Sequence, residues 1–128
     1  MELAPGGGNA GPYRGAKFSL FEGGIRVPCI ASLPGRLPEG VTRDQFCTSL
    51  DWLPTIAELC GLELPDHLEG RSLVPLLEDP TADWDHPAFT QVNRRGVPGH
   101  SVRTKRWRYI EWDNGRQGIQ LYDHENDP

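Results

Sequence analysis

Hydrophobic and polar positions recur with a helical period most clearly over residues 49–60. Apolar side chains stand there at spacings of three and four residues and form one stripe, made of Leu53, Ile56, Ala57 and Cys60. Ser49 or Asp51 can cap the first amides, and Pro54 falls in the first turn, where its missing N–H costs little. Gly61 accepts the left-handed conformation that ends many helices. The pattern predicts a helix over residues 49–60.

A second apolar run, Ile25–Leu33, is short and is bounded by a Gly-Gly pair and a Pro-Gly pair. Its length and its flanking residues favour a buried strand over a helix. Pro28 has no N–H to give to a sheet, so it should lie at a strand start, an edge or a bulge. Farther along, residues 72–78 predict one or two helical turns, closed by Pro80.

From His86 onward the pattern changes to the alternation that is typical of strands. Four segments are strand candidates: residues 88–92, 101–103, 107–112 and 119–122. Arg94–His100 contains two glycines and a proline and predicts a loop, while Asn114-Gly115 is a strong hairpin signal. This part of the chain should form a small antiparallel sheet.

Composition and charge narrow the class of protein. The 15 Gly and 12 Pro make loops abundant, and the net charge of −5 argues against a general nucleic-acid binder. Residues 94–108 nevertheless carry six cations and no acid: Arg94, Arg95, Arg103, Lys105, Arg106 and Arg108. This segment is either an exposed hairpin paired with neighbouring acids or a patch that meets an anionic substrate. No apolar run reaches the roughly 18 residues of a membrane span.

The three cysteines have no C-x-x-C spacing and stand among apolar residues, so small buried hydrophobic residues are favoured over a disulfide framework or a zinc site. His67, His86 and His124 show no metal-ligand spacing either, and no metal site is predicted in this chain. Met1–Gly11 does not have the pattern of a signal peptide. Both ends are expected to be cuts through a longer protein.

Lys17 is the first candidate for chemistry. It lies in a glycine-supported loop, and an ammonium fixed beside a cavity can donate to a tetrahedral oxyanion such as sulfate or phosphate. Glu22 and Arg26 stand four residues apart and can brace this loop as an ion pair. The alternative is an ordinary surface cation. The loop matches neither a Walker A sequence nor a dinucleotide fingerprint.

The same window carries a family resemblance. Gly15–Pro28 resembles the G-x-K-x-x-x-x-E-G-G-x-R-V-P stretch of type I sulfatases, in the alkaline-phosphatase-like superfamily. Three further segments resemble that family in the same order: the D-x-x-P-T-x-x-x-L-x-G helix within 50–61, the L-x-G-x-S-L segment at 68–73, and the closing sheet with its L-Y-D-x-x-x-D-P tail within 101–128. Within the family, the chain resembles arylsulfatase and iduronate-2-sulfatase-like members, and the segments 90–91, 101–112 and 122 resemble the iduronate-2-sulfatase-like members most.

The resemblance implies an α/β fold: the C-terminal fragment of an alkaline-phosphatase-like sulfatase, with a small antiparallel sheet subdomain at the end. Residues 1–12 would be a disordered Gly-rich start, residues 13–80 the end of the α/β domain, and residues 81–128 the truncated sheet subdomain. It also implies hydrolysis of a sulfate ester, with Lys17 as the residue that contacts the sulfate. Formylglycine and calcium are expected in a full-length parent.

The chain departs from the family pattern in its other catalytic parts. Cys29, Cys47 and Cys60 are not followed by x-P-x-R, the paired aspartates that ligate calcium are missing, and Pro5–Asn9 stands where the family has D-N-G or D-H-G. The chain alone is therefore expected to be inactive and to hold no cofactor. Its partner would be a sulfated small molecule or glycan, not a nucleic acid. A periplasmic, extracellular or lysosomal location is the family expectation only.

Four further side chains are candidates for substrate binding: His100, Arg94, Arg95 and Arg103. Arginine pairs bidentately with sulfate groups, which suits a sulfated sugar, whereas His100 can equally be a solvent-exposed loop residue. Trp107 and Trp112 are expected to pack in the sheet rather than stack on sugars, and Asp51 is expected to be a helix cap. The alternatives to a sulfatase fragment are a non-catalytic module that binds an anionic glycan through the 94–108 loop, and a structural remnant without a site.

Overall fold

The computed structural model describes residues 9–126 and divides into two compact units. The first unit combines the described residues up to Cys29 with the segment from Phe89 onward, and the second is Ile30–Ala88. Most of the predicted disordered start, residues 1–12, lies outside the described residues. The boundaries predicted at residues 12 and 80 stay predictions.

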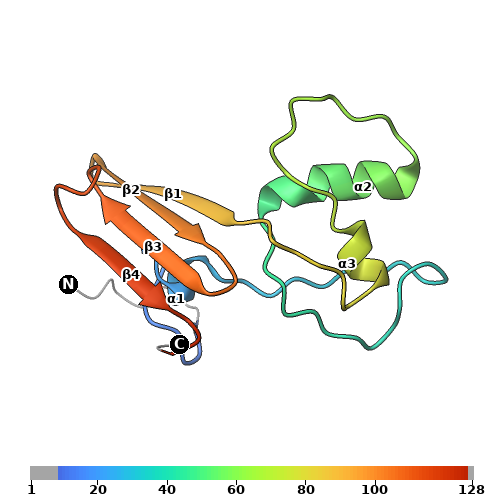
Figure 1. Cartoon of the computed structure of the whole chain (residues 1–128), viewed down its shortest axis with the longest axis horizontal. Coiled ribbons are helices and arrows are strands. Elements are labelled where there is room, and N and C mark those ends of the chain that lie inside the picture. Colours follow the sequence, from blue (N-terminus) through green and yellow to red (C-terminus); the bar gives the residue numbers. More distant parts are fainter. Residues whose placement is uncertain (1–8, 127–128) are drawn as a thin grey trace. The chain divides into compact units, whose positions relative to one another are not determined.

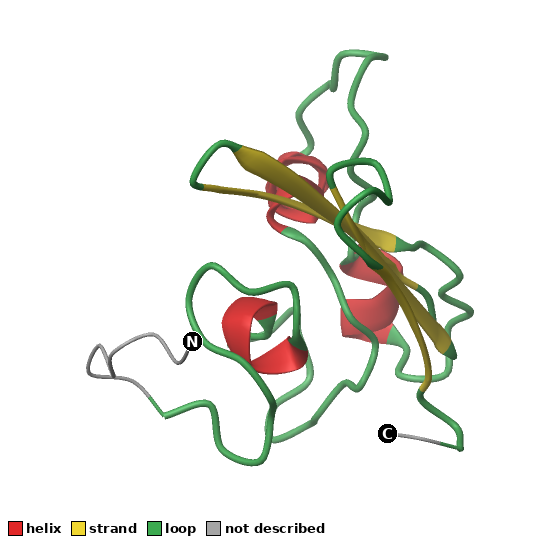
Figure 2. Cartoon of the chain, turned by 90° about the vertical axis from the view of Figure 1, so that its left-hand side faces the viewer, coloured by secondary structure: helices red, strands yellow, loops and turns green. Residues whose placement is uncertain are grey.

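A four-stranded sheet dominates the first unit, with its strands in the order β1-β2-β3-β4 (Figure 1). The strands are β1 (Ala88–Arg94), β2 (Val97–Arg103), β3 (Trp107–Trp112) and β4 (Ile119–Asp123). The pairs β2–β3 and β3–β4 are antiparallel, with Ser101 opposite Ile110 and Arg108 opposite Tyr122. The predicted small antiparallel sheet is confirmed, and Figure 2 shows its twist.

The loop predicted over Arg94–His100 is wrong. Only Arg95 and Gly96 separate β1 from β2, and both have positive φ, 54° and 85°. This two-residue turn suits the twist of a hairpin, so the chain resumes as a strand at Val97. The Oδ1 of Asn93 accepts the Gly96 N–H at 2.9 Å and closes the turn. His100 is therefore a residue of β2 and not of a loop.

The core of the sheet unit lies on one face of β2 and β3. Ile110 and Leu20 are its fully buried apolar side chains, and Ser101 and Arg108 are buried beside them. Trp112 packs over Gly99, where a Cβ would come 2.6 Å from the ring. Trp107 is 40% exposed and carries the Arg106 guanidinium 4.7 Å from its ring centroid, so its predicted packing in the sheet is wrong.

The strand predicted over Ile25–Leu33 is also wrong. The short helix α1 (Glu22–Ile25) ends there, and residues 26–33 have no regular structure. Val27 is 79% exposed and Ile30 is 93% exposed. A buried strand needs neighbouring strands on both sides, and the described residues supply none to this segment. The apolar composition of Ile25–Leu33 is typical of a buried strand, but no strand of the described residues pairs with this segment.

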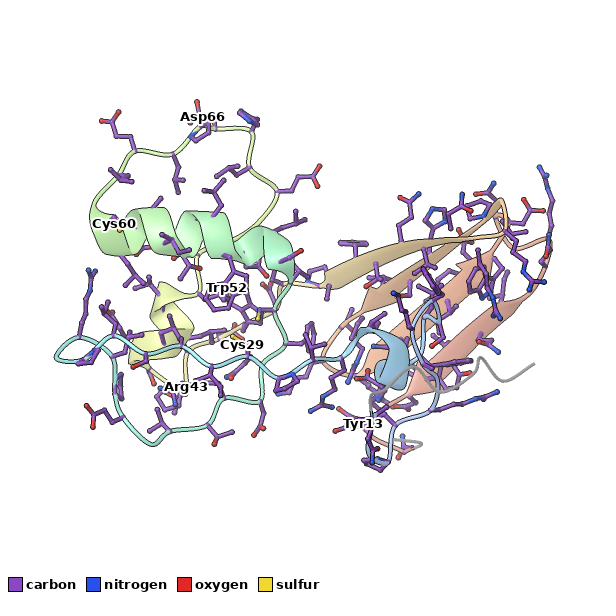
Figure 3. The ribbon with its side chains drawn as sticks, turned by 180° about the vertical axis from the view of Figure 1, so that it is seen from behind. Tyr13, Cys29, Arg43, Trp52, Cys60 and Asp66 are labelled. Atoms are coloured by element: carbon purple, nitrogen blue, oxygen red, sulfur yellow. The ribbon has the colours of Figure 1, made fainter. Side chains whose placement is uncertain are left out.

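The helix predicted in the second unit is confirmed. It begins with a 3-10 turn, η1 (Ser49–Asp51), continues as α2 (Trp52–Cys60), and ends at Gly61 with φ 68°. Figure 3 shows Trp52 and Cys60 at its two ends. The apolar stripe is mostly uncovered, because Ala57 is buried while Leu53 and Ile56 are more than half exposed.

The predicted short helix is also present, as α3 (Val74–Glu78). It contributes to the core of the second unit through Val74 and Leu76, which are buried together with Leu73. Thr55 of α2 is fully buried, and its Oγ1 accepts the Leu73 N–H at 2.8 Å. This bond ties α2 to the start of α3.

The prediction of buried cysteines is wrong, because Cys29, Cys47 and Cys60 are all exposed. Val27 and Ile30 near Cys29, and Ile56 and Leu62 near Cys60, are themselves more than half exposed. Across residues 9–126, no helix is long and apolar enough to cross a membrane.

Candidate functional site

Lys17 lies in a tight turn of the first unit. The Ser19 N–H donates to the Ala16 carbonyl at 2.9 Å, and the Ala16 N–H donates to the Ser19 Oγ at 3.3 Å. Gly15 and Phe18 have positive φ, 96° and 70°. This backbone projects the Lys17 side chain outward, where it is exposed and its Nζ lies 5.2 Å from the centroid of the Phe18 ring. Among the described residues no carboxylate pairs with this ammonium.

Two glycines let α1 lie against the lysine loop, which we define as residues 13–21. A Cβ on Gly23 would come 2.7 Å from the Tyr13 and Gly15 carbonyl oxygens, and one on Gly24 would come 2.6 Å from the Ala16 and Ser19 carbonyl oxygens. The Gly23 N–H donates to the Arg14 carbonyl at 2.8 Å. The Gly-Gly pair is therefore required for a loop that closes on the following helix.

Glu22 is the acceptor on which three guanidinium groups converge. Its carboxylate lies 2.5 Å from Arg108, 3.5 Å from Arg103 and 3.8 Å from Arg26. The predicted Glu22–Arg26 pair is thus confirmed, and Arg26 is its most exposed partner. Burial lowers the pKa of Arg103 and of Arg108 from their ordinary values, and the negative charge of Glu22 opposes that shift.

The cations of residues 94–108 do not form one patch. Arg106 pairs with Asp123 and, at 3.3 Å, with Glu125, while Arg103 and Arg108 turn to Glu22. Arg94 and Arg95 lie at the β1–β2 turn, at the other end of β2 from Arg103. Seven strand residues separate the two ends by about 20 Å. The structure therefore does not bring Arg94 and Arg95 together with Arg103.

His100 faces an acidic neighbour across the sheet. Its Nδ1 lies 3.6 Å from Glu111 Oε1, and the Tyr109 hydroxyl donates to Glu111 Oε2 at 3.0 Å. That hydrogen bond raises the pKa of Tyr109. His100 is thus placed in mid-strand beside a carboxylate, and not in the vicinity of the β1–β2 turn that carries Arg94 and Arg95.

Arg108 is the residue whose place the sequence analysis missed. The sequence predicts a cation of an exposed hairpin or patch there, yet the Arg108 side chain is only 5% exposed and its Nη1 donates to the Leu20 carbonyl at 3.0 Å. The alternation of β3 was the available signal, because Arg108 shares a face with Ile110. His124, which shows no metal-ligand spacing in the sequence, is a second such residue. Its Nε2 is buried with no hydrogen-bond partner among the described residues, and burial lowers its pKa.

Asp51 is the N3 residue of a capping box whose N-cap is Thr48, so the prediction that its side chain caps the first helical amides is wrong. Its Oδ2 accepts the Thr48 N–H at 2.7 Å and its Oδ1 accepts the Arg71 N–H at 2.9 Å. The carboxylate is fully buried, and His86 Nε2 lies 3.6 Å from Oδ1. Asp51 therefore fastens the start of the helix to the segment before α3.

The described residues do not supply a calcium site. Within residues 9–126 no group of three or more His, Cys, Asp or Glu side chains is placed to hold a metal ion. Calcium takes about six to eight oxygen ligands. The donor set of residues 9–126 thus does not fit the calcium expected of the family.

Comparison with known proteins decides the family. The family model described as "N-sulphoglucosamine sulphohydrolase, C-terminal" matches residues 14–128. The chain belongs to this sulfatase family. The match includes the lysine loop from Arg14 onward, α1, both α-helices of the second unit and all four strands.

Curated sulfatases are similar to this member of the family. Steryl-sulfatase of Homo sapiens is 42% identical over 82 residues, which cover 62% of this chain and 14% of that protein. Arylsulfatase A of Bos taurus is 47% identical over 72 residues, covering 56% and 14%. N-acetylglucosamine-6-O-sulfatase of Bacteroides thetaiotaomicron is 28% identical over 124 residues, covering 88% and 22%. The chain thus spans about a seventh to a fifth of the length of these relatives.

Solved structures agree with this assignment. One, a complex with its substrate D-glucosamine-2-N,6-O-disulfate, has a TM-score of 0.53 at 28% identity and covers 61% of this chain and 17% of its own. A 2-O GAG sulfatase has a TM-score of 0.51 at 31% identity, covering 61% and 18%. The small antiparallel sheet with a few helices is therefore the fold of a sulfatase C-terminal domain.

Proposed function

We propose that this sulfatase C-terminal domain belongs to a sulfuric ester hydrolase acting on a sulfated sugar or an aryl sulfate, and that Lys17 contributes the ammonium that contacts the sulfate. The observation that carries the proposal is the turn at Ala16–Ser19. It presents an exposed ammonium with no carboxylate partner among the described residues, within the segment that matches the family. A cation left unpaired by its own fold is available to an anionic ligand.

The ammonium would act by electrostatics. As the S–O bond breaks, negative charge builds on the sulfuryl oxygens and on the leaving oxygen, and a donor already in place lowers the energy of that arrangement. Lysine suits this task because it is a compact point charge with three donors. The loop would keep the ammonium in place without reorganisation at the moment of reaction.

The other catalytic groups are assigned to a longer parent protein. None of the cysteines lies in a C-x-P-x-R motif that could give formylglycine, and no calcium ligand set occurs among residues 9–126. This chain alone is therefore proposed to be inactive. Export to a periplasmic, extracellular or lysosomal compartment is part of the same proposal.

The substrate class rests on the relatives. The bacterial relative is an N-acetylglucosamine-6-O-sulfatase, and one solved neighbour is in complex with its substrate D-glucosamine-2-N,6-O-disulfate. The mammalian relatives are a steryl-sulfatase and an arylsulfatase. Sulfated sugars and aryl sulfates are therefore the two classes to assay first.

The test is Lys17→Ala in a sulfatase that carries this chain, with Lys105→Ala, another exposed lysine of the same unit, as the control. We expect kcat/KM to fall at least tenfold, about 1.4 kcal/mol, for Lys17→Ala only. An unchanged rate removes Lys17 from the site. The genomic DNA before Met1 gives an independent test, because an in-frame C-x-P-S-R motif with paired aspartates is expected there and a stop codon would contradict it.

A second candidate function is binding of an anionic glycan without catalysis. Arg95 favours it, since this exposed cation stands at the tip of a hairpin and is held there by a turn with positive φ. The candidate predicts salt-sensitive binding to a sulfated polysaccharide that weakens in the Arg94→Ala, Arg95→Ala double variant. Binding that persists in the double variant would count against it.

A further inference from the structure

Arg108 connects the sheet to the lysine loop, although 88 residues separate it from Leu20 in the sequence. We propose that Arg108 is a positioning residue for Lys17, acting through the Leu20 carbonyl and the Glu22 carboxylate. The inference rests on the proposed function of Lys17. It assigns a purpose to the C-terminal sheet: to fix the backbone that carries the sulfate-contacting ammonium.

The contact is a two-point clamp. One terminal nitrogen of Arg108 donates to the Leu20 carbonyl at 3.0 Å, and the other lies 2.5 Å from Glu22 Oε1. The guanidinium is almost fully buried, and Leu20 is 2% exposed. A buried cation that loses its partner is costly, so the clamp should stay closed.

The Leu20 and Glu22 contacts of Arg108 lie close to Lys17 in the chain and can therefore restrain the backbone that carries it. Leu20 follows Lys17 by three residues, and the bonds between Ala16 and Ser19 close that stretch into one turn. Gly24 packs directly on the carbonyls of this turn, so α1 and the turn cannot move independently. Holding Leu20 and Glu22 therefore fixes the direction in which Lys17 projects.

Other contacts of the loop are weaker or more exposed. The Phe21 ring meets Tyr122 edge-on at 6.3 Å between centroids, and Arg103 approaches Glu22 at 3.5 Å. Arg108 reaches a backbone carbonyl of the loop and the carboxylate of α1 at once. A guanidinium can do this because its nitrogens are fixed in a fork, whereas an ammonium is a single point.

The experiment compares Arg108→Lys with Arg116→Lys in a sulfatase that carries this chain. Arg116 is a matched control, because it is 76% exposed and its ion pair with Asp113 is 4.0 Å long. We expect Arg108→Lys to lower kcat/KM about tenfold, and the Lys17→Ala, Arg108→Lys double variant to be no slower than Lys17→Ala alone. A residue that acts only through global folding would instead add its effect to that of Lys17→Ala.

Amide hydrogen exchange supplies a readout apart from activity. In Arg108→Lys, exchange at Ser19, Gly23 and Gly24 should accelerate at least tenfold while the β3–β4 amides keep their wild-type rates. The proposal would be overturned if exchange accelerated both at Ser19, Gly23 and Gly24 and at the β3–β4 amides. It would also be overturned if exchange accelerated at neither set of amides. Should Arg108→Lys not fold, Glu22→Gln serves in the same cycle, and failure of both variants to fold would identify a general stability element and also overturn it.

The outcomes separate the two proposals. A silent Lys17→Ala variant refutes the proposed function. A slow Lys17→Ala variant, together with additive loss in the double variant, leaves that function standing and refutes the positioning role of Arg108.

Discussion

Arg106 donates two hydrogen bonds to the carboxylate of Asp123, from Nε to Oδ1 at 2.9 Å and from an Nη to Oδ2 at 2.7 Å. This bidentate pair joins the β2–β3 turn to the end of β4. The bonds from Arg106 hold the pKa of Asp123 far below its ordinary range, with smaller contributions from Asn126 and the Glu125 N–H. A charged, bidentate pair thus fastens this end of the sheet.

An acid-dependent loss of stability follows from this pair. Because the pKa of Asp123 is depressed on folding, its contribution is fully present above the unfolded-state value of about 3.9 and is lost as pH falls below it. Thermal melts of a sulfatase that carries this chain should therefore show little contribution of this pair to the pH dependence between pH 7 and pH 5, and a decline below about pH 4. Asp123→Asn should flatten part of that decline, whereas Asp113→Asn, whose ion pair is 4.0 Å long, should leave it unchanged. Identical acid profiles for Asp123→Asn and the wild type would contradict the assignment.

A second prediction concerns the hydroxyl of Thr55 in the second unit. It accepts the Leu73 N–H at 2.8 Å in a site without solvent access. Thr55→Val keeps the shape of the side chain and leaves that N–H unpaired, so in a sulfatase that carries this chain the free energy of unfolding in urea should fall by about 1–3 kcal/mol. Thr42→Val is the control, because Thr42 is exposed. Equal midpoints for the two variants would show that the bond contributes nothing.

Local signals explain which elements could be predicted. The ends of α2 follow from Asp51 and Gly61, and the β3–β4 hairpin follows from Asn114-Gly115, because each signal acts within a few residues. The hairpin at Arg95-Gly96 was missed because Pro98 and Gly99, which are typical of loops, lie within β2. An element could therefore be predicted where its end or turn signal is local, and it was missed where nearby residues typical of loops masked that signal.

Long-range contacts explain the rest. Whether the apolar run from Ile25 forms a strand depends on neighbouring strands, and the burial of Arg108 depends on a carbonyl 88 residues earlier. Periodicity specifies which residues share a face but not what covers that face. For the candidate site, Lys17 and the Glu22–Arg26 pair could be selected from the sequence, whereas the convergence of Arg103 and Arg108 on Glu22 could not.

The glycine at position 24 gives a third prediction. A Cβ there would stand 2.6 Å from the Ala16 and Ser19 carbonyl oxygens of the lysine loop, so Gly24→Ala must push the Ala16–Ser19 turn away from α1. In a sulfatase that carries this chain, kcat/KM should fall at least tenfold, and exchange at Ser19 should accelerate. Gly35→Ala provides the comparison, since its Cβ would meet nothing within 4 Å and its cost comes only from φ 78°. A wild-type rate for Gly24→Ala would show that the turn does not need its present packing.

The exposed apolar surface of this chain gives the last prediction. Val27, Ile30, Leu53 and Ile56 are each more than half exposed, and the segment from Arg26 to Leu33 has no regular structure. A monomeric protein seldom leaves so many large apolar side chains in water. The isolated chain should therefore be poorly soluble, bind a hydrophobic dye, and melt over a broad temperature range, with amide exchange fast in residues 26–48 and slowest in β2–β4.

The Leu53→Lys, Ile56→Lys double variant tests whether the exposed apolar side chains of α2, and not a general instability of the fold, make the isolated chain poorly soluble. These positions lie on the uncovered side of α2, so the charges should raise the solubility of the isolated chain and reduce dye binding without changing exchange in β2–β4. In a complete sulfatase the same double variant should lower the folded yield, because the charges would then be placed against the remainder of the protein. A sharp cooperative melt of the unmodified isolated chain, without dye binding, would show that these apolar side chains need no further partner.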